Sequence, residues 1–122
     1  MASVLIADDN SQLRGAMQLA LQAAGHRVRV ACNGREALDL QRQDPAALLI
    51  TDIFMPESDG FEAISGFRRE FPTTRIVVIS GDASRVKQEY LPVAEMIGVD
   101  ATLRKPFDMR ALLRTVSSVL DG

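Results

Sequence analysis

Short apolar runs alternate along the chain with longer stretches in which apolar residues recur at helical spacing. The runs are SVLIA from Ser3, RVRVA from Arg27, ALLIT from Ala47, RIVVIS from Arg75 and DATLR from Asp100. Helical spacing is clearest in the first intervening stretch, at Leu13, Met17 and Leu21, and in the last, at Met109, Leu112, Leu113, Val116, Val119 and Leu120. This alternation predicts five strands, each followed by a helix.

Residues typical of helix ends fall between these segments. Gly25 is placed to end the first helix, Asn33 with Glu36 forms an N-cap pair for the second, and Gly98 is placed to end the fourth. Pro92 falls inside the helical pattern that precedes Gly98. Because proline removes a backbone donor and clashes with the preceding turn, we expect a kinked or broken fourth helix.

The composition of the runs predicts their places in a sheet. The runs from Ser3, Ala47 and Arg75 are almost continuously apolar, which is typical of central parallel strands, whereas RVRVA alternates as an edge strand does. Five β/α units in 122 residues predict one α/β domain over residues 1–122, with a doubly wound parallel sheet flanked by five helices. In such sheets, binding sites form beyond the carboxyl ends of the strands.

Overall composition excludes several classes of function. The chain has 14 basic and 16 acidic residues and a formal net charge of -2, so no general field attracts nucleic acid or an anionic membrane. Its single cysteine, Cys32, cannot form an internal disulfide, and together with the single histidine, His26, it falls short of a structural zinc site. No run approaches the roughly 18 apolar residues of a membrane span, and no basic leader precedes the first run, so we expect a cytoplasmic protein.

Polar side chains follow four of the predicted strands. Asp8 and Asp9 follow the first, Asp52 ends the third, Ser80 ends the fourth and Lys105 ends the fifth. Because parallel strands end at one edge of the sheet, we expect these side chains to converge there. Crowded carboxylates repel one another unless they bind a cation or take up protons. Mg²⁺ prefers oxygen ligands and typically binds one or two carboxylates together with a phosphate oxygen, so the pattern predicts a magnesium and phosphoryl site.

Phosphate-binding motifs of nucleotide enzymes are missing from the chain. GREAL at 34–38 lacks the spacing of a P-loop, and no GxGxxG follows a strand, which argues against nucleotide binding. Without a base-activated serine or cysteine, the available nucleophile for a covalent phosphoenzyme is a carboxylate. Asp52 is the best-placed candidate.

Four separate motifs together resemble one known family. DD at 8–9, TDIFMPESDGFE at 51–62, ISGD at 79–82 and KPF at 105–107 are similar to the motifs of the receiver domain of two-component response regulators. The resemblance covers essentially the whole chain, and the four motifs fall in order at the ends of four strands. It implies a flavodoxin-like sheet with strand order 2-1-3-4-5.

The resemblance also implies a role for each pocket residue. Asp52 would accept a phosphoryl group from a phosphohistidine on a sensor histidine kinase or a histidine phosphotransfer protein. The implied magnesium ligands are Asp8, Asp9, Asp52 and the backbone carbonyl of Phe54. Lys105 and Ser80 would bind the phosphoryl oxygens, Gly81 would leave access to the phosphate open, and the peptide bond before Pro106 would be cis.

The resemblance has further implications for switching and for partners. Thr102 stands where the family commonly has a Tyr or Phe that moves inward on activation, so that aromatic relay is missing here. A downstream protein would bind the face made by the fourth helix, fifth strand and fifth helix. We expect no output domain in this chain, a monomer or a phosphorylation-dependent dimer, and no catalysis beyond its own phosphorylation and dephosphorylation.

Two other functions are compatible with the same pocket. One is a hydrolase of small phosphate esters that passes through an aspartyl phosphate, although the acid that such enzymes place two residues after the nucleophile would fall on Phe54. The other is a receiver-like module that binds partners without phosphorylation, although all five pocket positions hold competent residue types.

Overall fold

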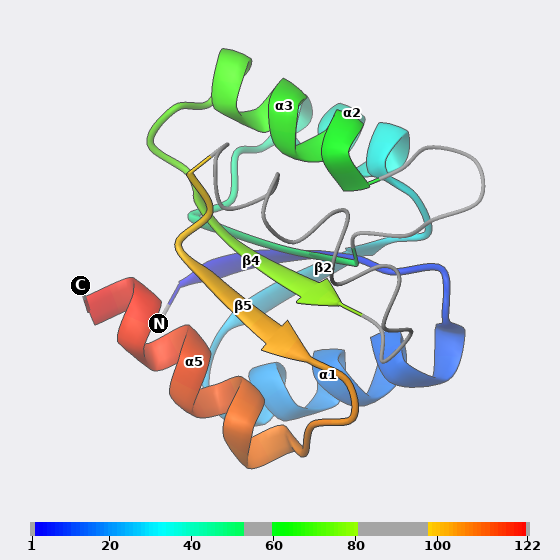
Figure 1. The fold of residues 1–122 in the computed structure, drawn as a ribbon, viewed down its shortest axis with the longest axis vertical. Coiled ribbons are helices and arrows are strands. Elements are labelled where there is room, and N and C mark those ends of the chain that lie inside the picture. Colours follow the sequence, from blue (N-terminus) through cyan, green and yellow to red (C-terminus); the bar gives the residue numbers. More distant parts are fainter. Residues whose placement is uncertain (1, 53–59, 81–97, 122) are drawn as a thin grey trace.

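The computed structural model describes residues 2–52, 60–80 and 98–121 and shows a five-stranded parallel sheet with helices on both faces (Figure 1). The elements are β1 (Ser3–Ala7), α1 (Ser11–Ala23), β2 (Arg27–Ala31), α2 (Gly34–Gln43), β3 (Leu48–Asp52), α3 (Gly60–Glu70), β4 (Arg75–Ser80), β5 (Ala101–Arg104) and α5 (Met109–Asp121). The strand order is β2-β1-β3-β4-β5, which confirms the predicted sheet. The described residues form four of the five predicted helices; the fourth, which contains Pro92, was predicted within a segment outside them.

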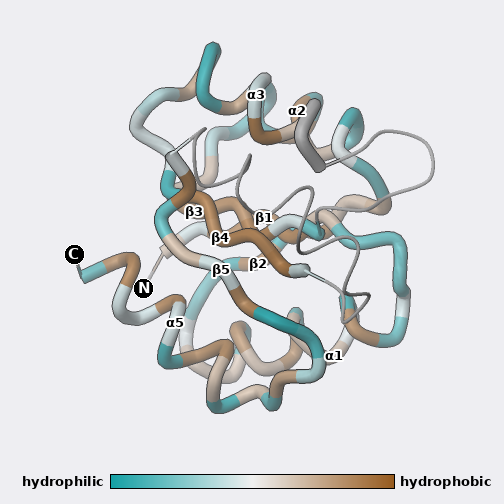
Figure 2. Tube along the Cα trace, viewed as in Figure 1, coloured by the Kyte–Doolittle hydropathy of each residue, from teal (hydrophilic) through white to brown (hydrophobic). Residues whose placement is uncertain are grey.

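In the part of the chain that the structure describes, two helices cover each face of the sheet. Helices α1 and α5 lie below it in Figure 1, and α2 and α3 lie above it. Successive strand residues point to opposite faces, so Val4 and Ile6 pack with Met17 of α1, whereas Leu5 packs with Phe67 of α3. Because both faces are covered, the central strands are apolar at nearly every position, as Figure 2 shows.

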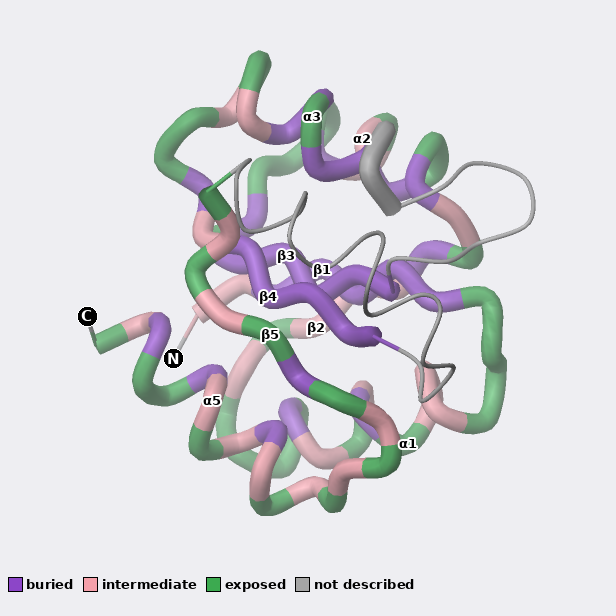
Figure 3. Tube along the Cα trace, viewed as in Figure 1, coloured by how far each residue is buried: buried purple, intermediate pink, exposed green. Residues whose placement is uncertain are grey.

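Burial separates the central strands from the edge strands. In Figure 3, β1, β3 and β4 are buried along nearly their whole length, whereas β2 and β5 carry exposed and half-buried positions. The predictions that β2 is an edge strand and that β1, β3 and β4 are central are therefore confirmed.

The predicted helix ends can be compared with the described backbone. α1 ends at Ala23, and Gly25 adopts a φ of 97°, the left-handed region that glycine enters without steric cost. The Asn33 side chain accepts from the backbone N–H of Glu36 at 2.8 Å and caps α2. The Glu36 carboxylate accepts from the N–H of Cys32 rather than from that of Asn33, so the capping pair is not fully reciprocal. None of the described helices is long and apolar enough to cross a membrane.

Candidate functional site

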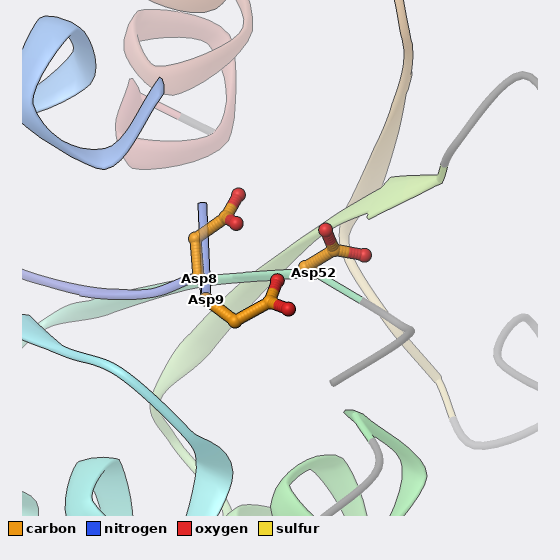
Figure 4. A group of neighbouring side chains, drawn as sticks. All are labelled: Asp8, Asp9 and Asp52. Carbon is orange, nitrogen blue, oxygen red and sulfur yellow. The ribbon is translucent and has the colours of Figure 1, made fainter. Parts of the chain in front are cut away.

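Three aspartates meet at the carboxyl edge of the sheet. Asp8 and Asp9 directly follow β1, and Asp52 is the last residue of the adjacent strand β3. Figure 4 shows the three side chains together, and one carboxylate oxygen from each lies within 4.8 Å of the others. The convergence expected from the strand ends is therefore present in the structure.

The environment of Asp52 follows from the pleat of β3. Asp52 shares a face of the strand with Leu48 and Ile50, which belong to the apolar cluster between the sheet and helices α1 and α5. Only 5% of Asp52 is exposed. Asp52 is therefore held by a buried strand at the carboxyl edge of the sheet.

Lys105, which follows the edge strand β5, brings a positive charge to the aspartates. Its Nζ lies 2.9 Å from Oδ2 of Asp52 and 4.0 Å from Oδ2 of Asp8. Its backbone N–H donates to the carbonyl of Ser80 at 2.9 Å, and the Lys105–Pro106 peptide bond is cis. Burial alone would lower the pKa of Lys105, but the hydrogen bond and charge of Asp52 raise it above its ordinary value. The ammonium group therefore stays charged beside Asp52 at neutral pH.

Asp8 is a buried carboxylate whose hydrogen bonds are incomplete among the described residues. It is fully buried, its Oδ1 accepts from the N–H of Asn10 at 2.8 Å, and its Oδ2 has no hydrogen-bond partner among the described residues. Burial raises the pKa of Asp8, and the nearby charge of Asp52 adds to the increase. An unsatisfied buried carboxylate oxygen in a group of three aspartates is well suited to a hard cation such as Mg²⁺.

Ser80 offers a hydroxyl at the same edge. It ends β4, which lies between β3 and β5, and it is 1% exposed. Its Oγ has no hydrogen-bond partner among the described residues. A buried hydroxyl without a partner at a strand end is available to donate to a ligand oxygen.

The remaining predicted site residues lie elsewhere or cannot be placed. Thr102 is exposed on β5, where it pairs in register with Val78. Phe54 and Gly81 lie outside the described residues. Sequence reasoning missed Arg14, whose Nη1 donates to the backbone carbonyl of Asp8 at 2.8 Å. The available signal was a basic residue in the first turn of a helix, where the helix dipole disfavours a positive charge.

Comparisons with known proteins agree on one family. A family model described as the response regulator receiver domain matches residues 4–117. The chain is 32% identical to the response regulator receiver protein CpdR of Brucella abortus, with 98% of each chain covered, and 33% identical to protein PilH of Pseudomonas aeruginosa, with 100% of each covered. It also matches 13% of the length of the sensor kinase CckA of Brucella abortus at 30% identity.

Solved structures give the same result for the fold. The chemotaxis protein CheY4 of Vibrio cholerae superposes with a TM-score of 0.87 at 32% identity, with 98% of both chains covered. NtrX of Brucella abortus reaches a TM-score of 0.91 at 25% identity, where 98% of this chain matches 27% of that one. The same domain thus recurs both as most of a chain and as a part of longer ones.

Proposed function

This chain belongs to the response regulator receiver family, and from that membership we propose that Asp52 is the phosphoacceptor of a two-component signalling switch. The observation that carries the proposal is the convergence of the Asp8, Asp9 and Asp52 carboxylates with the Lys105 ammonium group at the strand ends. The donor would be a phosphohistidine on a sensor histidine kinase or a histidine phosphotransfer protein.

The proposed reaction moves a phosphoryl group from nitrogen to oxygen. A carboxylate oxygen of Asp52 attacks phosphorus, a P–O bond forms, and the P–N bond breaks with its electron pair returning to the donor imidazole. Charge spreads over the three equatorial phosphoryl oxygens during transfer, so catalysis consists mainly of positioning and charge stabilisation. Lys105 holds its ammonium group 2.9 Å from Asp52, where those oxygens would arrive, and Ser80 holds a hydroxyl on the neighbouring strand.

The three carboxylates are the proposed ligands of a metal ion. Asp8, Asp9 and Asp52 would hold Mg²⁺, with the backbone carbonyl of Phe54, outside the described residues, as a further candidate ligand. When bound, the ion neutralises negative charge on the carboxylates and on the phosphoryl oxygens. The oxygen of Asp8 that has no hydrogen-bond partner among the described residues supports this assignment, and so does the raised pKa of Asp8, which burial and the charge of Asp52 cause.

Phosphorylation would change the contacts of Lys105 and Ser80. Each would gain a charge-assisted hydrogen bond to a phosphoryl oxygen, and such bonds contribute about 1.5 to 3 kcal/mol each. Changing the ratio of active to inactive conformation from 1:99 to 99:1 needs roughly 5.5 kcal/mol. Two such bonds therefore shift this equilibrium strongly only if they form mainly in the active conformation. Since Thr102 is not aromatic, the readout would use movement of the backbone rather than an inward-turning ring.

The proposed partners follow from the same switch. The downstream protein would bind the face of β5 and α5, together with the predicted fourth helix outside the described residues. The chain would act in the cytoplasm as a monomer or a phosphorylation-dependent dimer, and would promote only its own phosphorylation and dephosphorylation.

A beryllofluoride titration tests the proposal. Backbone amide shifts are followed in the wild type and in Asp52→Asn with Mg²⁺ and beryllofluoride, which mimics a phosphoryl group on a carboxylate. We expect saturable shifts at the strand ends in the wild type and their loss in the variant. No saturable change in the wild type would reject the switch, and the same change in Asp52→Asn would reject Asp52. Sustained turnover of acetyl phosphate, rather than a single phosphorylation, would favour the hydrolase.

A further inference from the structure

Arg14 contacts the one peptide group that joins two of the clustered aspartates. Its Nη1 donates to the carbonyl oxygen of Asp8 at 2.8 Å. That carbonyl belongs to the same planar peptide as the N–H and Cα of Asp9. A hydrogen bond that restrains this carbonyl therefore also restrains the peptide plane between the two residues.

The orientation of this peptide affects where the side chains of Asp8 and Asp9 lie. In an extended strand, neighbouring side chains point to opposite faces of the sheet. Asp8 and Asp9 instead bring their carboxylates into one cluster with Asp52, and the chain bends at Asp9 to allow this. Three hydrogen bonds hold Asp8 next to this bend. Its N–H donates to the carbonyl of Ala31, its carboxylate accepts from the N–H of Asn10, and its carbonyl accepts from Arg14.

The place of Arg14 in α1 is unfavourable for the helix itself. It lies in the first turn, which contains no acidic residue to offset its charge. The positive end of the helix dipole disfavours a cation there. Arg14 forms no ion pair with Asp8 or Asp9, so its described contact with the cluster is through the backbone and not through charge pairing.

We propose that Arg14 is a positioning residue for the metal site, which orients the Asp8–Asp9 peptide so that the three carboxylates bind one divalent cation together. This inference rests on the proposed function of the cluster. Groups that orient metal ligands typically change metal affinity by about 10-fold to 100-fold when they are removed. Arg14 reaches the cluster through the backbone carbonyl of Asp8.

The test measures Mg²⁺ affinity by isothermal titration calorimetry with Mg²⁺ alone. Arg14→Met keeps the packing of the side-chain stem and removes the donor, and Arg14→Lys keeps a charge and one donor group. The matched control is Arg75→Met, which removes an equal charge and a guanidinium that donates to the backbone carbonyl of Val119 at 3.0 Å. Arg75 begins β4, at the opposite edge of the sheet from the aspartates.

We expect the Mg²⁺ dissociation constant to rise about 10-fold or more in Arg14→Met, to rise less in Arg14→Lys, and to stay within about twofold in Arg75→Met. Urea unfolding without metal identifies variants that remain folded, and amide hydrogen exchange at Asp9 and Asn10 should increase in Arg14→Met alone. A folded Arg14→Met with wild-type affinity would overturn the inference, as would equal losses in Arg14→Met and Arg75→Met. If wild type binds Mg²⁺ no better than Asp9→Asn does, the proposed function of the cluster fails instead.

Discussion

The ammonium nitrogen of Lys105 lies 2.9 Å from a carboxylate oxygen of Asp52, so the proposed acceptor has a positively charged partner within the protein. The same nitrogen lies 4.0 Å from Asp8. A cation that binds these carboxylates must share them with Lys105. We therefore expect the lysine that would favour phosphoryl transfer to oppose metal binding before transfer.

Lys105→Met should separate these two effects. Removing the competing ammonium should strengthen Mg²⁺ binding about fivefold, the equivalent of about 1 kcal/mol for one partly exposed ion pair. The same variant should lose most of the amide shifts that beryllofluoride induces, because the phosphoryl oxygens lose their cation. Calorimetry gives the first quantity and amide spectra give the second.

Arg104→Met is the matched control for this pair of measurements, because it removes one exposed positive charge from the neighbouring position on β5. Its Mg²⁺ affinity should stay within about twofold of the wild type. An unchanged Mg²⁺ affinity in Lys105→Met would show that Lys105 does not compete for Asp52.

Asp8→Asn should stabilise the metal-free protein at neutral pH. Burial raises the pKa of Asp8 in the folded protein above its ordinary value of 3.8. The stability that the protonated Asp8 contributes is therefore fully present below pH 3.8 and is lost as the pH rises through the raised pKa. The asparagine amide carries no charge, so the free energy of unfolding of Asp8→Asn at pH 7 should exceed that of wild type by about 1–3 kcal/mol. Urea unfolding at pH 7 and at acidic pH, with a chelator present, checks this result, since the advantage should shrink in acid.

Adding Mg²⁺ should favour the stability of wild type over that of Asp8→Asn, the opposite of the order expected without metal. A ligand that binds only the folded state stabilises it in proportion to the logarithm of its concentration over the dissociation constant. Wild type should therefore gain more stability from Mg²⁺ than Asp8→Asn does. Equal gains would contradict the assignment of Asp8 as a metal ligand.

Most of the fold could be predicted because its causes are local in the sequence. The continuous apolar runs of β1, β3 and β4 arise because helices cover both faces, and the alternation in β2 reflects an edge. The positions of Asp8, Asp9 and Asp52 could be predicted for the same reason, since strand ends in a parallel sheet share one edge.

The polar contacts that hold these elements together could not be predicted. Gln41 lies in a helix rich in polar residues, yet it is fully buried and bonds Thr74, which is 33 residues away. Arg14 likewise bonds a backbone carbonyl, a partner that no side-chain pattern reveals. The spacing of apolar residues indicates which face of a helix is apolar, but it does not indicate which polar residues form hydrogen bonds with distant parts of the chain.

Gly15 and Gly66 should respond differently to alanine. Both lie within helices, where alanine typically gains about 0.5–1 kcal/mol over glycine. A Cβ on Gly15 would meet no atom within 4 Å, so Gly15→Ala should gain the full amount. A Cβ on Gly66 would lie 3.0 Å from Cδ2 of Leu38 on α2, so Gly66→Ala should gain less or lose stability. Equal gains in urea unfolding would show that the α2–α3 contact accommodates a methyl group.

Gln41 should be the most sensitive polar residue of α2. Its side chain donates to the carbonyl of Ala46 and to the hydroxyl of Thr74, both at 3.1 Å, and accepts from the N–H of Ala46 at 2.8 Å. Gln41→Leu would leave these buried groups unpaired and should lower the free energy of unfolding by at least about 2 kcal/mol. Gln43→Leu, an exposed position on the same helix, should stay within about 0.5 kcal/mol of wild type.

The position of this contact also separates stability from signalling. Ala46 and Thr74 precede the starts of β3 and β4, so the Gln41 contact lies at the edge of the sheet opposite Asp52. Gln41→Leu that remains folded should therefore keep the beryllofluoride-induced amide shifts at the strand ends, with wild-type Mg²⁺ affinity. If Gln41→Leu is as stable as Gln43→Leu, burial of the apolar leucine offsets the loss of all three hydrogen bonds. If folded Gln41→Leu loses the beryllofluoride response, the two edges of the sheet are energetically coupled.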